Sequence, residues 1–146
     1  MMKKGEIDTN CWNVLIVDDN EDLHNITINA FFDEEIENRE IKFLSASNEK
    51  EAIAKLNNFH KDIAVMILDM VMDHNGDEGV RVLEHIFYTL GNRKTQVILR
   101  TGYARKDEVK NVKNDFPEVV ILEKGETDVW ELMQLVTDAI IKFNEK

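Results

Sequence analysis

Short apolar runs alternate with amphipathic stretches along this chain. A continuous run of only a few apolar residues is typical of a strand that is buried on both faces of a parallel sheet. In the stretches between the runs, apolar residues recur at helical spacing, which predicts helices packed against that sheet. The runs predicted to form strands are residues 14–17, 41–44, 63–68, 97–99 and 119–122.

The helical stretches carry start and stop signals of different strength. Asn48, with Glu51 three residues later, predicts a helix start, and Gly91 with Asn92 predicts a helix end. The stretch 104–115 is the weakest helical pattern, because it offers few apolar residues to a core. In the first predicted helix, the residues expected to share the buried face are Leu23, Ile26, Ala30 and Phe31.

Strands and helices that alternate in this way predict an α/β fold. The predicted architecture is a five-stranded doubly wound parallel sheet with five helices, joined by right-handed crossovers. Among doubly wound sheets, the strand order 2-1-3-4-5 has its topological switch point between the first and third strands. Ligands bind at such a point, so the residues that end these two strands are candidates for the functional site.

Acidic residues come directly after both of these strands. Asp18 and Asp19 follow the run 14–17, and Asp69 follows the run 63–68. Because neighbouring parallel strands end at the same edge of a sheet, three carboxylates are expected to converge there. Carboxylates at close range repel one another, so the sequence predicts a site for a hard divalent cation with oxygen ligands.

Two other strand ends add polar groups to the same edge. The fourth strand is followed by Thr101 and Gly102, a hydroxyl and then a residue without a side chain, and the fifth is followed by Lys124. A metal ion, a carboxylate apart from the acidic pair, a hydroxyl and a lysine are together typical of phosphoryl transfer. In that chemistry Asp69 attacks phosphorus in line, and the cations neutralise the phosphoryl oxygens.

Size and charge limit the alternatives. The 146 residues suffice for one domain, predicted as residues 12–146 after an N-terminal extension of residues 1–11. The formal net charge of −11 argues against nucleic acid or an anionic membrane as partner. No stretch approaches the length of a membrane span. A single cysteine cannot form an internal disulfide, which together with the charged N-terminus predicts a cytoplasmic protein.

The strand-end motifs resemble those of the receiver domain of two-component response regulators, the CheY-like fold. Residues 14–19 are similar to that family's first strand and acidic pair, and residues 68–70 to its phosphoacceptor segment. Thr101 with Gly102 resembles its switch residue and the small residue after it, and Lys124 its lysine. The segments 69–82 and 91–102 further resemble a subgroup of receivers found ahead of cyclic-dinucleotide phosphodiesterase or other signalling domains.

The resemblance implies a phosphorylation-activated switch in which Asp69 accepts a phosphoryl group from a histidine kinase or a histidine phosphotransfer protein. It also implies Mg2+ (or Mn2+), bound directly by Asp19, Asp69 and the backbone carbonyl of Val71. Asp18 would act mainly through a metal-bound water. Phosphotransfer and dephosphorylation would be self-catalysed, so the chain is not expected to be an enzyme in any other sense.

By the same resemblance, Thr101 and Lys124 would contact the phosphoryl oxygens. Signals would leave through a downstream effector protein or a homodimer, on the face made by the fourth helix, fifth strand and fifth helix. The position three residues before Lys124, aromatic in the family, is Ile121, and the residue after Lys124 is not proline. The coupling of threonine to an aromatic ring is therefore not expected here in its usual form. The candidates for the switch and output are Thr101, Gly102, Tyr103, Ile121 and Trp130.

Several other interpretations of these residues stay open. Asp18 and Asp19 are also suitable helix caps, and capping alone would leave Asp69, Thr101 and Lys124 unexplained. A pseudo-receiver would keep the fold as an interaction module without being phosphorylated. A metal-dependent phosphatase with an aspartyl nucleophile would carry an acid two residues after it, where this chain has Val71. The four histidines lack metal-ligand spacing and are predicted to be structural or surface residues.

Overall fold

The sheet has the parallel arrangement that the apolar runs predict. The computed structural model describes residues 7–70, 77–101, 106–123 and 129–146. Five strands pair in parallel in the spatial order β3-β1-β4-β5-β6, which is the predicted order 2-1-3-4-5. These strands are β1 (Trp12–Val17), β3 (Arg39–Ala46), β4 (Ile63–Asp69), β5 (Gln96–Thr101) and β6 (Val120–Glu123).

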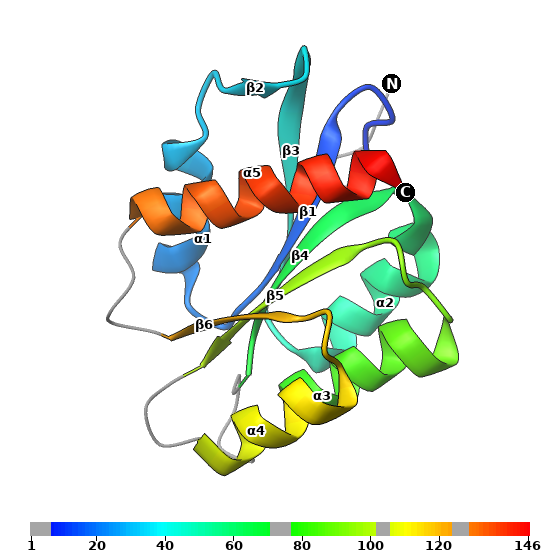
Figure 1. Cartoon of the computed structure of the whole chain (residues 1–146). Helices are drawn as coiled ribbons and strands as arrows, with labels where there is room; N and C mark the ends of the chain where they lie inside the picture. The colour runs from blue at the N-terminus through cyan, green and yellow to red at the C-terminus, as the bar shows by residue number, and fades with distance from the viewer. Residues whose placement is uncertain (1–6, 71–76, 102–105, 124–128) are drawn as a thin grey trace.

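Helices cover both faces of the sheet, as Figure 1 shows. One face packs against α1 (Glu21–Ala30) and α5 (Val129–Glu145), and the core on this side includes Ile16 and Ile67. The other face packs against the remaining helices, with Val17 and Leu68 in its core. Alternate residues of one strand thus enter different cores, which explains why the runs are continuously apolar. The remaining helices are α2 (Glu49–Phe59), α3 (Glu78–Glu84) and α4 (Lys106–Asp115).

A sixth strand, β2 (Glu35–Ile36), was not predicted from the sequence. It pairs antiparallel with β3 through a two-residue turn, Glu37-Asn38, in which both residues have positive φ, 52° and 65°. A turn with two positive φ angles matches the twist of a hairpin, but glutamate rarely adopts that conformation, so the turn signal was weak. The indole Nε1 of Trp12 donates to the carbonyl of Ile36 at 2.6 Å and ties this hairpin to β1.

The predicted helix boundaries hold at two places. The Asn48 side chain accepts a hydrogen bond from the Glu51 amide at 2.8 Å, which caps α2 as expected. Gly91, with a φ of 63°, follows a π-helical segment, His85–Thr89, that extends α3. A left-handed residue commonly ends a helix, and glycine adopts that conformation at little cost.

The buried face predicted for α1 is wrong in part. Ile26 is 50 % exposed, whereas His24 and Thr27 are buried. Their polar atoms have partners inside the protein: the Thr27 hydroxyl donates to the Leu23 carbonyl at 2.8 Å, and His24 bonds to two neighbouring segments. The spacing of apolar residues could not predict that His24 is buried, because histidine counts as a polar residue whether or not its ring nitrogens have partners inside the protein.

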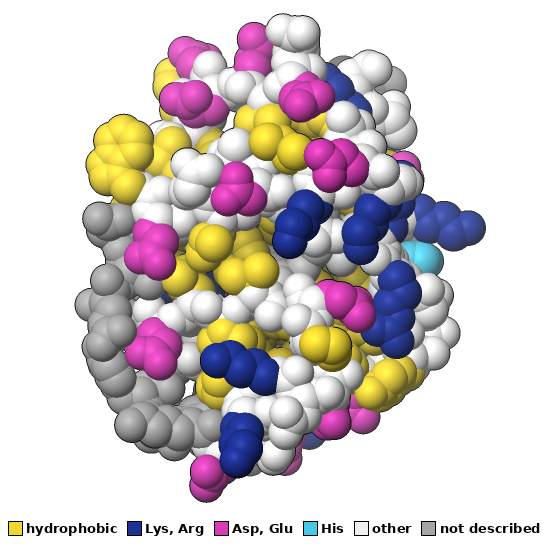
Figure 2. Space-filling model, viewed as in Figure 1, with side chains coloured by type: hydrophobic (Ala, Val, Ile, Leu, Met, Phe, Trp, Pro, Cys, Tyr) yellow, Lys and Arg dark blue, Asp and Glu magenta, His cyan; other side chains and the backbone are white. Residues whose placement is uncertain are grey.

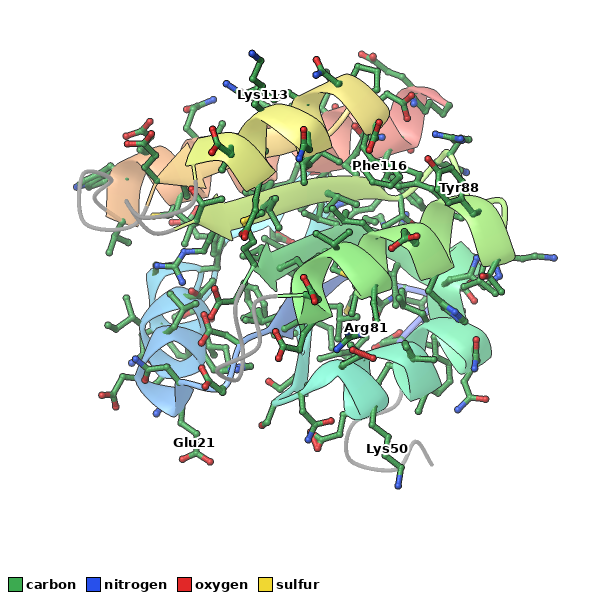
Figure 3. All side chains as sticks on the ribbon, turned by 90° about the horizontal axis from the view of Figure 1, so that it is seen from below. Glu21, Lys50, Arg81, Tyr88, Lys113 and Phe116 are labelled. Carbon is green, nitrogen blue, oxygen red and sulfur yellow. The ribbon has the colours of Figure 1, made fainter. Side chains whose placement is uncertain are left out.

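Contacts between helices fix the layer that lies below the sheet in Figure 1. In Figure 3, Arg81 of α3 points toward α2, where its guanidinium pairs with the Glu49 carboxylate. The hydrogen bond that Arg81 donates to the Glu49 carboxylate raises the pKa of Arg81 above its usual value. Tyr88 and Phe116 lie against each other in the same view, with ring centroids 5.4 Å apart, and connect the end of α3 to the end of α4.

The negative net charge is not spread evenly over the surface. Figure 2 shows Lys and Arg side chains gathered around the C-terminal end of α5, and Asp and Glu side chains over other parts of the same face. No helix in the described part of the chain is both long enough and apolar enough to cross a membrane. The ends of β1, β4 and β5, where the candidate site lies, are at the opposite end of the sheet from the C-terminus (Figure 1).

Candidate functional site

Three carboxylates meet at the carboxyl ends of β1 and β4. Asp69 is the last residue of β4, and Asp18 and Asp19 come directly after β1. The two strands are neighbours, with Val17 opposite Leu68, so Asp18 and Asp69 extend the same register. Carboxylate oxygens of Asp18, Asp19 and Asp69 lie within 4.8 Å of one another. Asp18 and Asp69 are buried, and Asp19 is exposed.

Asp18 is held by hydrogen bonds to several segments. Its Oδ1 accepts the Asn20 amide at 2.8 Å, and its Oδ2 pairs with Nη1 of Arg100 at 3.2 Å. Its own amide donates to the carbonyl of Ala46, at the end of β3, at 3.0 Å. The helix cap of α1 is Asn20, whose side chain accepts the Asp22 amide, so capping does not account for the acidic pair.

His24 contacts the backbone of Asp18, and this contact was not predicted from the sequence. Its Nε2 lies 2.8 Å from the Asp18 carbonyl, and its Nδ1 lies 2.9 Å from the Ser45 hydroxyl. Because a carbonyl only accepts, Nε2 carries the proton, and in the neutral ring Nδ1 accepts from the hydroxyl. The histidine is therefore structural, as its lack of metal-ligand spacing predicted, but the structure it supports is the candidate site.

The end of β5 lies beside the acidic cluster. Arg100 is opposite Asp69 in the register of β4 with β5, and the Met70 amide donates to the Arg100 carbonyl at 3.0 Å. Thr101, the next residue, ends β5 and is buried. Thr101 pairs in register with Glu123, the residue before Lys124. The hydroxyl predicted for the site therefore lies at the same edge of the sheet as the carboxylates.

The remaining predicted site residues divide into two groups. Ile121 lies in β6, half-buried, and packs against the core shared with α3 and α4. Trp130, in the first turn of α5, is 77 % exposed and so presents a large apolar surface to solvent. Val71, Gly102, Tyr103 and Lys124 lie outside the described residues.

Arg100 is a site residue whose role was not predicted from the sequence. Arg100 is the one charged residue of strand β5, and this feature of the sequence could have identified it as a site residue. A charge in a strand otherwise suited to the interior requires a partner, because burial of an unpaired charge is costly. The partner is Asp18, on the far side of β4.

The start of α3 rests directly on the end of β4. The Gly79 amide donates to the Met70 carbonyl at 3.2 Å. A Cβ atom on Gly79 would lie 2.7 Å from the Met70 carbonyl oxygen and 2.9 Å from that of Asp69. Only glycine permits so close an approach of the two backbones. The position of Asp69 is therefore fixed from β1, from β5 and from α3.

Glu78, the first residue of α3, is buried beside this contact. It is 3 % exposed, and neither carboxylate oxygen has a hydrogen-bond partner among the described residues. A carboxylate at a helix N-terminus gains about 0.3–1 kcal/mol from the helix dipole. That gain is smaller than the ~1–3 kcal/mol that burial of an unsatisfied polar group costs.

Glu78→Met is therefore expected to raise the free energy of unfolding, by about 1–3 kcal/mol. For a chain of this size, the melting temperature would rise by roughly 2–4 °C for each kcal/mol. Thermal unfolding followed by circular dichroism measures this. Glu84→Met, an exposed glutamate of the same helix, is the matched control and should change little. A lower melting temperature for Glu78→Met would show instead that the carboxylate is needed where it lies.

The donor set of the cluster fits a hard divalent cation. Three carboxylates within 4.8 Å of one another, set against one guanidinium, leave an excess of negative charge at the sheet edge. Oxygen ligands of this kind suit Mg2+, which is usually bound through one or two carboxylates and keeps several waters. Asp18, Asp19 and Asp69 are the described residues that could hold such an ion.

Comparisons with known proteins agree on the fold. No protein-family model matches the chain. A receiver domain protein from Clostridium thermocellum superposes with a TM-score of 0.72 at 20% identity, covering 90% of this chain and 95% of that one. A CheY-like receiver domain protein from Methanospirillum hungatei JF-1 gives 0.71 at 18% identity, covering 92% and 98%. The chain has the receiver-domain fold. The receiver domain of NtrX from Brucella abortus agrees, with a TM-score of 0.68 at 18% identity over 88% of this chain and 98% of that one.

A curated relative is similar in sequence as well. The 3'3'-cGAMP-specific phosphodiesterase 2 of Vibrio cholerae serotype O1 is 31% identical over 125 residues, which make up 86% of this chain. The match covers 24% of the phosphodiesterase, so the chain spans about a quarter of that relative's length. The resemblance to receivers, including those associated with cyclic-dinucleotide phosphodiesterases, is thereby confirmed, and the CheY-like fold class with it.

Proposed function

We propose that this receiver domain is a phosphorylation-dependent signalling switch. Asp69 accepts a phosphoryl group from a histidine kinase or a histidine phosphotransfer protein, and the reaction depends on Mg2+ or Mn2+. The observation that carries the proposal is the convergence of Asp18, Asp19 and Asp69 at the switch point of a doubly wound sheet, with Thr101 at the same edge.

The transfer needs only a carboxylate nucleophile and cations. A carboxylate oxygen of Asp69 forms a bond to phosphorus while the bond from phosphorus to the donor breaks. With a phosphohistidine donor, the leaving group is the imidazole of the kinase, and with acetyl phosphate it is acetate. Hydrolysis reverses the state: water attacks phosphorus, the bond to Asp69 breaks, and inorganic phosphate leaves. In this proposal the domain catalyses only these two steps.

The residues around Asp69 have distinct roles in this proposal. Asp19 and Asp69, with the Val71 carbonyl, would hold the metal ion directly, and Asp18 would act through a bound water. When bound, the metal ion neutralises negative charge on the phosphoryl oxygens. Thr101 would donate its hydroxyl to one of these oxygens and Lys124 its ammonium to another. Thr101 is buried at the end of β5, one residue after the register partner of Asp69, and this position supports the role proposed for its hydroxyl.

In this proposal the domain transmits its signal by binding a partner at its surface. The face formed by α4, β6 and α5 is the proposed contact for a downstream effector protein or for a second copy of the domain. The exposed Trp130 at the start of α5 supports this choice, because exposed aromatic side chains are enriched in interfaces. The relative from Vibrio cholerae is a cyclic-dinucleotide phosphodiesterase, which supports control of a signalling domain of that class.

The proposal is tested by measuring the intact mass of the folded chain after incubation with acetyl phosphate and Mg2+. We expect a gain of one phosphoryl group, and no gain when EDTA removes the metal. A folded chain that binds Mg2+ but gains no mass would contradict the proposal and favour a pseudo-receiver. Steady release of phosphate from a phosphomonoester would instead favour an aspartyl phosphatase.

A further inference from the structure

The Arg100 side chain reaches across β4, the strand that ends in Asp69. Arg100 lies on β5 and Asp18 at the end of β1, and β4 runs between these two strands. Neighbouring strands are about 4.8 Å apart, so a side chain that links β5 to β1 must pass over β4. The β4 residue opposite Arg100 is Asp69, and residues opposite each other project from the same face of a sheet. The guanidinium therefore reaches Asp18 by passing over Asp69.

The ion pair with Asp18 is well enclosed but engages little of the guanidinium. The Arg100 side chain is 18 % exposed and that of Asp18 is 3 % exposed. The contact uses one nitrogen, Nη1, at 3.2 Å from Oδ2. A guanidinium carries five N–H donors in a planar fork, and this fork matches the oxygens of a phosphoryl group better than a single carboxylate oxygen.

A metal ion in the acidic cluster, whether bound by Asp18 directly or through a water, would compete with Arg100 for the negative charge of Asp18. The Asn20 amide already occupies Oδ1 of Asp18, and Arg100 occupies Oδ2. A divalent cation bound among the three carboxylates would weaken the attraction between Asp18 and Arg100. A phosphoryl group on Asp69 would at the same time replace the single negative charge of that carboxylate with a charge of about −2 next to the guanidinium. Both changes favour a move of Arg100 from Asp18 to the phosphoryl oxygens.

We propose that Arg100 is the residue that changes partner on phosphorylation: it pairs with Asp18 in the free domain and with the phosphoryl oxygens when Asp69 is modified. This inference rests on the proposed function. It also gives the signal a route from Asp69 to the end of β5. Arg100 directly precedes Thr101, and the Arg100 carbonyl accepts a hydrogen bond from the Met70 amide. Movement of its side chain acts on the end of β5, in a chain whose Ile121 supplies no aromatic partner for a threonine switch.

Two affinities of the whole chain test the inference, each measured by isothermal titration calorimetry. The first is the affinity for Mg2+ alone, and the second is that for beryllofluoride, a phosphoryl mimic, at saturating Mg2+. Arg100→Gln removes the competitor of the metal, so Mg2+ should bind several-fold more tightly. The same variant should bind beryllofluoride about 10-fold more weakly, since a charge-assisted bidentate contact is lost.

Two variants make the comparison specific. Arg93→Gln removes an exposed arginine that pairs with Glu118, so both affinities should equal those of the wild type. Arg100→Lys keeps a charge near Asp18 but not the fork, so beryllofluoride affinity should fall while Mg2+ affinity stays within about 2-fold. If Arg100→Gln does not fold, as judged by circular dichroism, the lysine variant decides through beryllofluoride alone: weaker binding supports the inference, and unchanged binding overturns it.

Failure of the inference can be told apart from failure of the proposed function. If the wild type gains a phosphoryl group and Arg100→Gln binds beryllofluoride equally well, Arg100 is a structural counter-ion and the inference is overturned, while the function stands. Weaker Mg2+ binding by Arg100→Gln also overturns it, because no competition then exists. If the wild type neither binds beryllofluoride nor gains mass from acetyl phosphate, the proposed function fails and the inference fails with it.

Discussion

Asp69→Asn is expected to abolish phosphoryl uptake from acetyl phosphate in the presence of Mg2+. Asparagine keeps the size of the side chain at the end of β4, so the register with β1 and β5 is preserved. The amide lacks the anionic oxygen that attacks phosphorus, and it also removes one negative charge from a cluster whose atoms lie within 4.8 Å. Chemistry and metal affinity are therefore both lost, whereas folding is not.

Intact-mass spectrometry, run beside circular dichroism, measures this effect. Asp115→Asn is the matched control, since Asp115 is exposed at the end of α4 and remote from the cluster. This control should gain one phosphoryl group like the wild type. If Asp69→Asn still gains a phosphoryl group, another residue is the acceptor, and peptide mapping for modified Asp18 or Asp19 would identify it.

Gly79→Ala is expected to destabilise the chain and to impair the site together. The added Cβ would lie 2.8 Å from the Met70 Cα and closer still to its carbonyl oxygen, which are backbone atoms that no side-chain rotation can move away. The start of α3 and the end of β4 must separate. Overpacking of this kind costs about 1–3 kcal/mol, and the backbone contact here favours the upper end. The melting temperature should fall by roughly 2–4 °C for each kcal/mol.

Because Asp69 moves with the Met70 backbone, Gly79→Ala should also slow phosphoryl uptake. Gly91→Ala is an informative control. No atom lies within 4 Å of a Cβ at Gly91, but its φ of 63° strains any other residue, at about 1–2 kcal/mol. It should lower the melting temperature modestly and leave phosphoryl uptake unchanged. Normal uptake by a clearly destabilised Gly79→Ala would show that the α3 contact does not position Asp69.

Local patterns were sufficient to predict the fold and the acidic cluster. The run of residues 63–68 is apolar on both faces of the strand, so it is buried only when helices cover both sides of the sheet. The acidic residue that ends this strand then lies at the carboxyl edge of the sheet. The predicted strand order then brings Asp18 and Asp69 together, as observed. The hairpin of β2 escaped prediction because a two-residue strand has no periodicity and its turn begins with glutamate.

The amino-acid sequence by itself determined which residues end the strands, because burial on two faces and the period of a strand are properties of neighbours along the chain. Only the tertiary structure decided that Arg100 reaches Asp18, that His24 supports it, and that Gly79 lies against Met70. Each of these contacts joins different elements, and its geometry depends on strand register and helix placement. A one-residue shift in register would reverse the face on which Arg100 projects, so no local pattern could have shown its partner.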